Sequence, residues 1–434
     1  MKQPVTIFWF RRDLRLEDNH GLYQALKHYS NVLPIFIFDP EIIDELPQSD
    51  ARLAFIHDQL KNIKQTLEDK FESTLLTLYQ RPEEAFKTLL DQYAIKVVIT
   101  NTDYEPYAIA RDTEVTQLLK QHQITFLSYK DQVIFEQNEV VKSDGTPYVV
   151  YTPYMRRWRD HLNQTQIKSF DTLKHASSFL KTTAYPFHSL EDLKHSPSRI
   201  KIPQYKVDKD MVTAYEATRN FPAIKGTSKL GPHLRFGTVS IRKLVDYCLK
   251  FSNDTFLKEL IWREFFMQIL WHFPHTAERA FKSKYDRIAW RNNSDDFKAW
   301  CEGKTGYPLV DAGMRELNET GFMHNRVRML VGSFLCKHLL IDWRWGEAYF
   351  AEKLNDYEMA SNVGNWQWVA GCGVDAAPYF RIFNPTTQIQ KFDKQLQYIN
   401  KWVQDLNTLE YPQPVVDHKL ARERCLKTYK AALD

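Results

Sequence analysis

The stretch from residue 323 to residue 387 concentrates the side chains that could do chemistry. Arginines, amides and indoles alternate there along segments with the apolar spacing of buried helices, and nine of the eleven tryptophans lie from Trp262 onward. An indole is costly to bury unless its N–H finds a partner. The enrichment therefore favours a flat aromatic ligand, stacked bases or an electron path. A helical core that happens to be rich in tryptophan is the alternative.

Two sets of residues in this part of the chain have helical spacing. Glu259, Trp262 and Arg263 are three and four residues apart, so they share one face of a predicted helix. They form either a structural ion pair beside a packed indole or the wall of a polar pocket. Asn325 and Met329, four residues apart, face together in the same way.

Trp366 and Trp368 are two residues apart, which separates them by roughly 200° around a helix. They should therefore point into different environments and have separate roles.

A loop from Gly226 to Gly231 could bind phosphate. It supplies two hydroxyls, a lysine and free backbone N–H groups just before a predicted helix, in the order Thr227, Ser228, Lys229, Leu230, Gly231. Such groups beside a helix start can hold an anion. A plain helix cap is the alternative interpretation, and Tyr215, twelve residues earlier than Thr227, carries little information by itself.

The first 130 residues alternate short apolar runs with helical patterns. The runs read as buried strands at 5–10, 32–38, 74–78, 96–100 and 124–127, and the helical patterns cover 51–70, 83–93 and 105–122. This alternation predicts a doubly wound, five-stranded parallel sheet with helices on both faces. Gly21 is the only glycine before Gly145, so no Gly-x-Gly-x-x-Gly loop is available for a pyrophosphate. A large nucleotide cofactor should therefore bind elsewhere in the chain.

The rest of the chain divides into a connector and a helical part. Residues 131–200 look irregular, with prolines and polar clusters, apart from a possible helix start at 151–158. Strand signals vanish from about residue 207, and helical patterns follow at 211–220, 240–251, 255–271, 306–320, 324–340 and 345–355. We therefore predict an α/β domain over 1–130, a connector over 131–200 and an all-helical domain over 201–434.

The composition indicates the cellular compartment in which the protein works. Five scattered cysteines without a Cys-x-x-Cys pair argue for a reducing, cytoplasmic environment and against a disulfide framework or a metal site. No apolar run is long enough to span a bilayer.

The net charge of +4 is distributed unevenly along the chain. Residues 1–195 include 23 basic and 27 acidic residues, whereas residues 196–434 include 35 basic and 27 acidic residues. The basic second half can be plain solvated surface, but with the aromatic enrichment it favours a polyanionic partner such as DNA.

Several long motifs together resemble the DNA photolyase and cryptochrome family, and specifically the microbial class I cyclobutane pyrimidine dimer photolyases. They are Trp-Phe-Arg-Arg-Asp-Leu-Arg-Leu-Glu-Asp-Asn at 9–19, Glu-Leu-Ile-Trp-Arg-Glu-Phe at 259–265, Gly-Lys-Thr-Gly-Tyr-Pro at 303–308, Met-His-Asn-Arg at 323–326, Phe-Arg-Ile-Phe-Asn-Pro-Thr-Thr at 380–387 and Tyr-Pro-Gln-Pro-Val-Val-Asp-His-Lys at 411–419. The resemblance covers nearly the whole chain.

The resemblance implies a role for each matching residue. A U-shaped FAD would be bound in the helical domain by Tyr215, Thr227, Ser228, Lys229, Leu230, Gly231, Glu259, Arg263, Asn325, Arg328, Asp356, Tyr357, Glu358 and Asn362, with the Asn362 amide facing flavin N5. The lesion pocket would comprise Glu259, Trp262, Asn325, Met329 and Trp368. Arg219, Arg326 and Arg381 resemble DNA-contacting positions, where Trp262, Asn325 and Trp368 also meet the DNA. Trp366, Trp343 and Trp290 match the chain of tryptophans that links the flavin to the surface.

Two departures from the family pattern stand out. The run from Asp356 to Trp366 somewhat resembles cryptochromes of the DASH type. For a second, antenna chromophore of folate or deazaflavin type, Glu105 matches a folate-contacting glutamate, but Ala277 stands where some folate-binding relatives have a lysine. The antenna chromophore therefore stays open.

The function implied is light-driven reversal of cyclobutane pyrimidine dimers in double-stranded DNA by electron transfer from reduced FAD, in a monomer without an obligate protein partner. One rival is a cryptochrome, a blue-light photoreceptor without repair activity. Another is a photolyase for the (6-4) lesion, which has histidines at the positions of Asn325 and Met329. A light-independent FAD oxidoreductase is disfavoured because no NAD(P)H fingerprint is present.

Overall fold

The computed structural model describes residues 2–182 and 185–434 of the chain, which form two compact units. The first unit comprises residues 1–136, 162–203 and 230–250, and the second comprises 137–161, 204–229 and 251–434. Each unit therefore takes in pieces that are far apart in sequence. The domain limits drawn from the sequence at residues 130 and 200 stay predictions.

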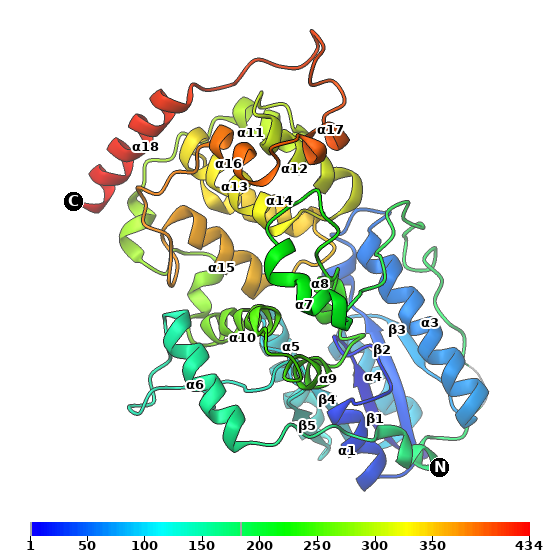
Figure 1. Cartoon of the computed structure of the whole chain (residues 1–434). Helices are drawn as coiled ribbons and strands as arrows, with labels where there is room; N and C mark the ends of the chain where they lie inside the picture. The colour runs from blue at the N-terminus through cyan, green and yellow to red at the C-terminus, as the bar shows by residue number, and fades with distance from the viewer. Residues whose placement is uncertain (1, 183–184) are drawn as a thin grey trace. The chain divides into compact units, whose positions relative to one another are not determined.

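A five-stranded parallel sheet forms the centre of the first unit, as the sequence predicts (Figure 1). Its strands lie in the order β3-β2-β1-β4-β5. Their bounds are β1 Gln3–Phe10, β2 Val32–Phe38, β3 Leu76–Tyr79, β4 Tyr93–Asn101 and β5 Thr125–Tyr129. The reversal of strand order on either side of β1 is the mark of a doubly wound sheet.

Both faces of this sheet are covered by helices. Side chains of β1 alternate, so that Phe8 and Phe10 pack with α1 and α3, whereas Ile7 and Trp9 pack with α4 and α5. The helices and the 3-10 turn of this unit are α1 His20–His28, α2 Pro40–Ile43, α3 Ala51–Phe71, α4 Pro82–Gln92, α5 Pro106–Gln121, η1 Thr172–Ser178, α8 Gly231–Arg235 and α9 Ile241–Cys248. One predicted boundary is wrong. Tyr93 was assigned to a helix but begins β4, because it pairs with Gln3 of β1.

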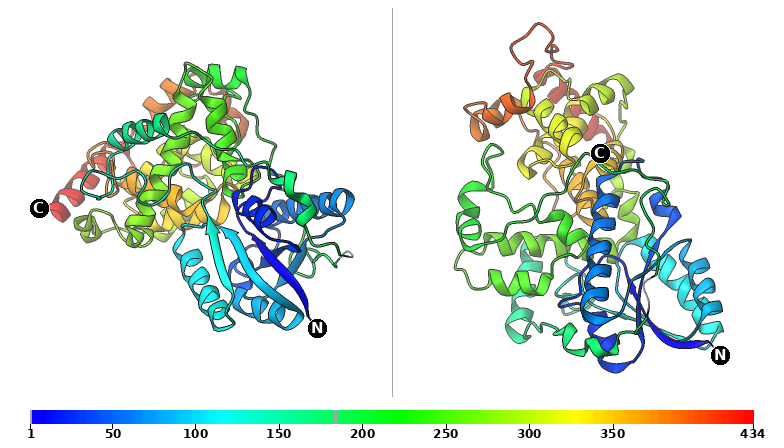
Figure 2. Two further views of the ribbon diagram at one scale, coloured as in Figure 1. Left: turned by 90° about the horizontal axis from the view of Figure 1, so that it is seen from below. Right: turned by 90° about the vertical axis from the view of Figure 1, so that its right-hand side faces the viewer.

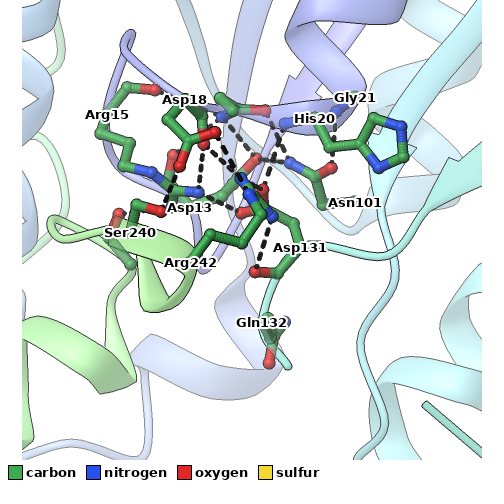
Figure 3. Close-up of polar contacts among 12 residues, drawn as sticks. Asp13, Arg15, Asp18, His20, Gly21, Asn101, Asp131, Gln132, Ser240 and Arg242 are labelled. Atoms are coloured by element: carbon green, nitrogen blue, oxygen red, sulfur yellow. Dashed lines mark hydrogen bonds and ion pairs between the residues drawn. The ribbon is translucent and has the colours of Figure 1, made fainter. Parts of the chain in front are cut away.

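A buried polar cluster at the carboxyl ends of β1, β4 and β5 holds this unit together (Figure 3). We call it the sheet-edge network; it comprises Asp13, Arg15, Asp18, Asn19, Asn101, Asp131, Ser240 and Arg242. Arg242 binds Asp18 at 3.1 Å and Asp131 at 2.8 Å, and Arg15 binds Asp131 at 2.6 Å. Burial favours a raised pKa for Asp131, but the two arginines outweigh it and hold that pKa below its usual value. The motif at 9–19 thus serves to fasten residues 230–250 to the sheet.

The second unit is built from helices, as the sequence predicts for this half of the chain (Figure 2). They are α6 Tyr151–Gln164, which the unit division cuts after residue 161, then α7 Lys209–Thr218, α10 Thr255–His272, η2 Pro274–Ala277, η3 Ser283–Arg287, α11 Ser294–Glu302, α12 Pro308–Thr320, α13 Asn325–Ser333, a π-helical turn Phe334–Leu339, α14 Trp343–Lys353, α15 Met359–Ala370, α16 Pro385–Phe392, α17 Gln397–Trp402 and α18 His418–Leu433. No helix in the described part of the chain is long and apolar enough to cross a bilayer.

One predicted helix has a different form in the structure. The pattern over 324–340 indicates a single helix, but α13 ends at Ser333 and continues as the π-helical turn up to Leu339. Leu340 then adopts a left-handed conformation with φ of 55°, which ends the segment. His324 is not part of the helix but caps it, since its side chain accepts the Arg326 N–H.

Candidate functional site

Helix α10 carries three of the predicted site residues on one face. Leu260, Ile261 and their apolar neighbours are buried, while Glu259, Trp262 and Arg263 stay partly exposed. The three- and four-residue spacing therefore places them on a common face, as predicted.

Both charged residues on this face are ion-paired. Arg263 Nη2 lies 2.8 Å from Glu358 Oε1, with both side chains largely buried, and Glu358 is the N-cap residue just before α15. This pair fastens α10 to α15. Glu259 is paired with Arg219, the residue that follows α7, and about a third of each side chain is exposed. Glu259 is thus held in place and still accessible.

Trp262 has one face covered and part of its ring free. Tyr151 is stacked on it with ring centroids 3.6 Å apart and an interplanar angle of 7°. The ring centroids of Phe265 and Phe266 lie 5.6 Å and 5.5 Å from that of Trp262. The half-buried indole is therefore fixed among aromatic rings.

The start of α13 presents residues that differ in exposure. Asn325 is exposed, and Arg326 and Met329 are partly exposed, with Arg326 Nη1 3.5 Å from the Met329 Sδ. Arg328 donates to the Met323 carbonyl at 2.7 Å and to Asp356 Oδ2 at 2.9 Å. Asp356 is therefore tied to α13.

Helix α15 carries the predicted amide and both indoles. Asn362 is buried, and its Nδ2 donates to Glu347 Oε1 at 2.9 Å; burial raises the pKa of that carboxyl. Trp366 is 3% exposed and packs against Phe350 at 5.0 Å. Trp368 is partly exposed, with the Arg381 guanidinium 6.0 Å from its ring centroid. The two indoles thus occupy different environments, as predicted.

The remaining tryptophans of the predicted chain lie at different depths. Trp343 is 2% exposed, and the Arg344 guanidinium lies 4.8 Å from its ring centroid. Trp290 is partly exposed and lies 5.9 Å from the buried ring of Tyr429.

The predicted phosphate-binding segment is divided between the two units. Thr227, Ser228 and Lys229 belong to the second unit, whereas Leu230 and Gly231 belong to the first, where Gly231 begins α8. Lys229 Nζ lies 3.0 Å from the ring centroid of Phe322. Burial lowers the pKa of Lys229 to about 8; Glu316 opposes this shift and Arg328 adds to it.

Tyr215, also in the second unit, is on α7 with its ring 5.0 Å from Phe256. Tyr357 lies just before α15 and packs against the apolar core of the second unit.

Two buried polar atoms near Lys229 have no hydrogen-bond partner among the described residues: His324 Nε2 and Asp356 Oδ1. Burial, helped by Lys229 and Arg328, lowers the pKa of His324 to about 4, so its ring is neutral at pH 7. Because His324 Nδ1 accepts from the Arg326 N–H, Nε2 carries the hydrogen. A free donor and a free carboxylate oxygen fit a ligand with both acceptor oxygens and hydroxyls, and FAD has both.

Three arginines gather near these residues. Arg326 is partly buried, which lowers its pKa, and Arg219 and Arg381 lower it further because their charges are close. Arg381 is exposed. The three predicted DNA-contacting residues therefore form one positive region on the second unit.

The first unit contains a separate cavity of about 160 Å³, lined by Glu105 among other residues. Glu105 binds Arg235 at 2.5 Å and Arg12 at 3.2 Å. Trp9 forms part of the wall, with the guanidiniums of Arg11 and Arg111 each 5.0 Å from its ring. The remaining walls are largely apolar, including Phe36, Phe38, Ile42, Ile43, Leu53, Ile56 and Phe236.

Comparison with known proteins decides the family. Residues 256–410 match the model for the FAD binding domain of DNA photolyase, and residues 6–174 match that for DNA photolyase. The deoxyribodipyrimidine photo-lyase of Agrobacterium fabrum is 36% identical over 476 residues, covering 99% of this chain and 98% of that protein. The chain belongs to the photolyase and cryptochrome family.

Solved structures of photolyases share the fold over the whole length. A bacterial class III photolyase from Agrobacterium tumefaciens is 35% identical with a TM-score of 0.87, covering 100% of this chain and 98% of that one. An archaeal photolyase from Sulfolobus tokodaii, described with two FAD molecules, is 32% identical with a TM-score of 0.83, covering 98% and 100%. This chain therefore has an N-terminal photolyase domain with a parallel sheet and a C-terminal helical FAD-binding domain.

Two residues of the candidate site, Glu347 and Tyr151, were not predicted from the sequence. Glu347, which binds the Asn362 amide, gave no signal, because nothing in its local pattern points to a partner fifteen residues away. Tyr151 could have been found, since Tyr151, Tyr154 and Trp158 repeat at three- and four-residue intervals and so form an aromatic face on α6.

Proposed function

We propose that this photolyase-family protein repairs cyclobutane pyrimidine dimers in DNA, using light absorbed by bound, reduced FAD. The observation that carries the proposal is the grouping, within the second unit, of a partly exposed carboxylate and indole on α10 with the three clustered arginines. Its placement among class I enzymes stays a prediction, because a class III photolyase is among the similar structures.

The residues of the second unit would hold FAD by charge and hydrogen bonds. Lys229 and the His324 Nε2–H would meet phosphate or hydroxyl oxygens, and the free Asp356 oxygen would accept from a hydroxyl. The buried Asn362 amide would face the ring system. Bound, reduced FAD would supply the electron that splits the dimer under light. The protein contributes binding, orientation and electrostatics.

The α10 face would bind the lesion after it leaves the duplex. Photolyases are among the enzymes known to take their target base out of the stack. Trp262 and Trp368 offer aromatic surfaces, and Glu259 offers a hydrogen-bond acceptor for a base edge. The ion pair with Arg219 holds the Glu259 carboxylate in place.

Met329 distinguishes this proposal from repair of (6-4) lesions. That reaction needs a proton donor, and a thioether cannot donate a proton. We therefore expect repair of cyclobutane dimers under blue light and no repair of (6-4) lesions.

The test is a repair assay on two oligonucleotides, one with each lesion, in light and in darkness. Glu259→Ala is expected to lower the repair yield more than the flavin content measured by absorbance. Glu319→Ala removes an exposed glutamate on α12 and should change neither. Equal repair of both lesions, or light-independent repair, would contradict the proposal.

We also propose that the cavity of the first unit binds an antenna chromophore of folate or deazaflavin type. Its aromatic walls suit a flat conjugated ring, and its arginines suit an anionic tail. The Sulfolobus tokodaii relative, described with two FAD molecules and the implication of a novel light-harvesting cofactor, supports a chromophore in addition to the catalytic FAD. Chromatography of the chromophores released from purified protein would identify the molecule, and Glu105→Gln should reduce its amount but not that of FAD.

A further inference from the structure

Tyr151, the first residue of α6, is the parallel stacking partner of Trp262. The two rings are 3.6 Å apart and tilted by 7°, whereas Phe265 meets the indole nearly edge-on, at 80°. The Tyr151 hydroxyl donates to the Lys258 carbonyl at 2.8 Å, which anchors the ring to α10 one turn before Trp262. Tyr151 is itself buried, at 7% exposed.

The backbone of Tyr151 makes a second connection. Its N–H donates to Asp375 Oδ2 at 3.2 Å, so a carboxylate from a distant segment satisfies a free N–H at the start of α6. Asp375 has a left-handed backbone with φ of 46° and lies between Trp368 and Arg381 in sequence. Tyr151 thus contacts Trp262 through its ring and the segment from Trp368 to Arg381 through its backbone.

We propose that Tyr151 is a positioning residue for lesion recognition: it fixes the plane of the Trp262 indole so that the ring's uncovered part is ready to stack on a flipped pyrimidine dimer. The inference rests on the proposed function, because it assumes that Trp262 meets the lesion. An indole free to change rotamer loses that freedom on binding, which weakens binding. A partner stacked at 3.6 Å removes the freedom in advance.

The ring and the backbone connection can be separated experimentally. Tyr151→Leu removes the stack but keeps the backbone N–H that Asp375 accepts from, and Tyr151→Phe keeps the stack and removes only the hydroxyl. Tyr154→Leu is the matched control. It deletes an equal ring from the same face of α6, where Tyr154 packs on Phe265 at 5.2 Å.

The first measurement needs no DNA. In flavin-loaded protein labelled with 5-fluorotryptophan, the ¹⁹F resonance of Trp262 is assigned as the one missing from Trp262→Phe. We expect Tyr151→Leu to shift and broaden this resonance, and Tyr151→Phe and Tyr154→Leu to leave it close to its wild-type position. An unmoved Trp262 resonance in folded Tyr151→Leu would overturn the positioning role.

The second measurement is binding to an oligonucleotide with one cyclobutane dimer and to its undamaged counterpart. Tyr151→Leu should weaken dimer binding between about two-fold and about twelve-fold, the range expected for one aromatic pair. Binding to undamaged DNA should not change. Tyr151→Phe should stay within about two-fold of wild type, a loss no greater than the low end of that range.

The outcomes separate this inference from the proposed function. Wild-type protein that does not prefer dimer DNA would contradict the proposed function itself. Wild-type protein that prefers it, with Tyr151→Leu equally selective, would overturn the inference alone. An equal loss in Tyr154→Leu would show that α6 acts only as general support. If Tyr151→Leu does not fold, Tyr151→Phe still tests the inference, since a large loss of selectivity with the stack intact would contradict it.

Discussion

Single residues decide how an electron could reach the flavin. Trp366 is buried on α15, one helical turn after Asn362, and packs against Phe350 at 5.0 Å and Trp300 at 6.2 Å. Trp343 is equally buried, and Trp290 is partly exposed. This gradient from buried to exposed suits a path from the flavin to a reductant outside the protein.

We expect Trp366→Phe to abolish flavin photoreduction by a thiol, because phenylalanine is not oxidised under these conditions. The same variant should repair dimers once its flavin is reduced chemically, since we propose that the path serves flavin reduction and not dimer splitting. Absorbance changes under blue light give the first result, and a repair assay gives the second. Trp402→Phe, a partly exposed indole on α17, is the control. Normal photoreduction in Trp366→Phe would show that the path is wrongly assigned.

For this site, the sequence predicts well which residues lie together. It predicts less well which residues of other helices they contact. Helical spacing was enough to place Glu259 with Trp262 and to separate Trp366 from Trp368, because these relations depend only on helix geometry. The Glu259–Arg219 and Asn362–Glu347 contacts depend on how different helices pack. Spacing within one segment carries no information about that packing.

At the level of elements, the sheet-edge network makes a prediction about stability. Arg242 lies between Asp18 and Asp131, which are buried, so Arg242→Ala would leave two buried carboxylates short of a cation. Breaking such a pair costs about 3–5 kcal/mol. Urea unfolding should show a loss of this size for the first unit. Lys243→Ala, which removes an exposed pair with Glu17, should cost at most about 1 kcal/mol. Equal losses in the two variants would contradict this account.

The same network predicts acid sensitivity. The folded pKa of Asp131 is held below its unfolded value, so its ion pairs stabilise the fold above about pH 4 and are lost as the pH falls through the folded pKa. Arg242→Ala removes one of the two arginines that depress this pKa. Acid unfolding of that variant should therefore begin at higher pH than in the wild type, which circular dichroism along a pH titration would measure.

Elements of the sheet were easier to predict than helix ends. The strands β1, β2 and β4 are apolar runs that are largely buried, which is a strong sequence signal, whereas the edge strand β5 has no buried residue. The break in the helix predicted over 324–340 was missed because the residues of the π-helical turn, Phe334–Leu339, keep the apolar pattern of a helix. The turn differs in backbone hydrogen bonding, which composition does not reveal.

For the whole molecule, the charge asymmetry predicts how binding to DNA responds to salt. Removing one true phosphate contact lowers the slope of log affinity against log salt concentration by about one. We expect this for Arg381→Gln, because Arg381 is exposed, and a smaller change for Arg219→Gln, because Glu259 already pairs with that charge. Preference for dimer DNA should persist in Arg381→Gln. Lys61→Gln, on the exposed side of α3, is the control, and an unchanged slope in Arg381→Gln would show that the DNA surface lies elsewhere.

The dependence of the first unit on residues 230–250 also has a consequence for protein synthesis. A nascent chain that has just passed β5 and reached Asp131 contains Asp18 and Asp131 but not Arg242. At ordinary translation rates, the ribosome needs on the order of ten seconds to add the missing segment. During that time the buried carboxylates have too few cations, and the apolar surface that Ala176, Phe179 and Phe236 cover in the folded unit is left open. The N-terminal domain is therefore synthesised first but is completed only when the middle of the chain has left the ribosome.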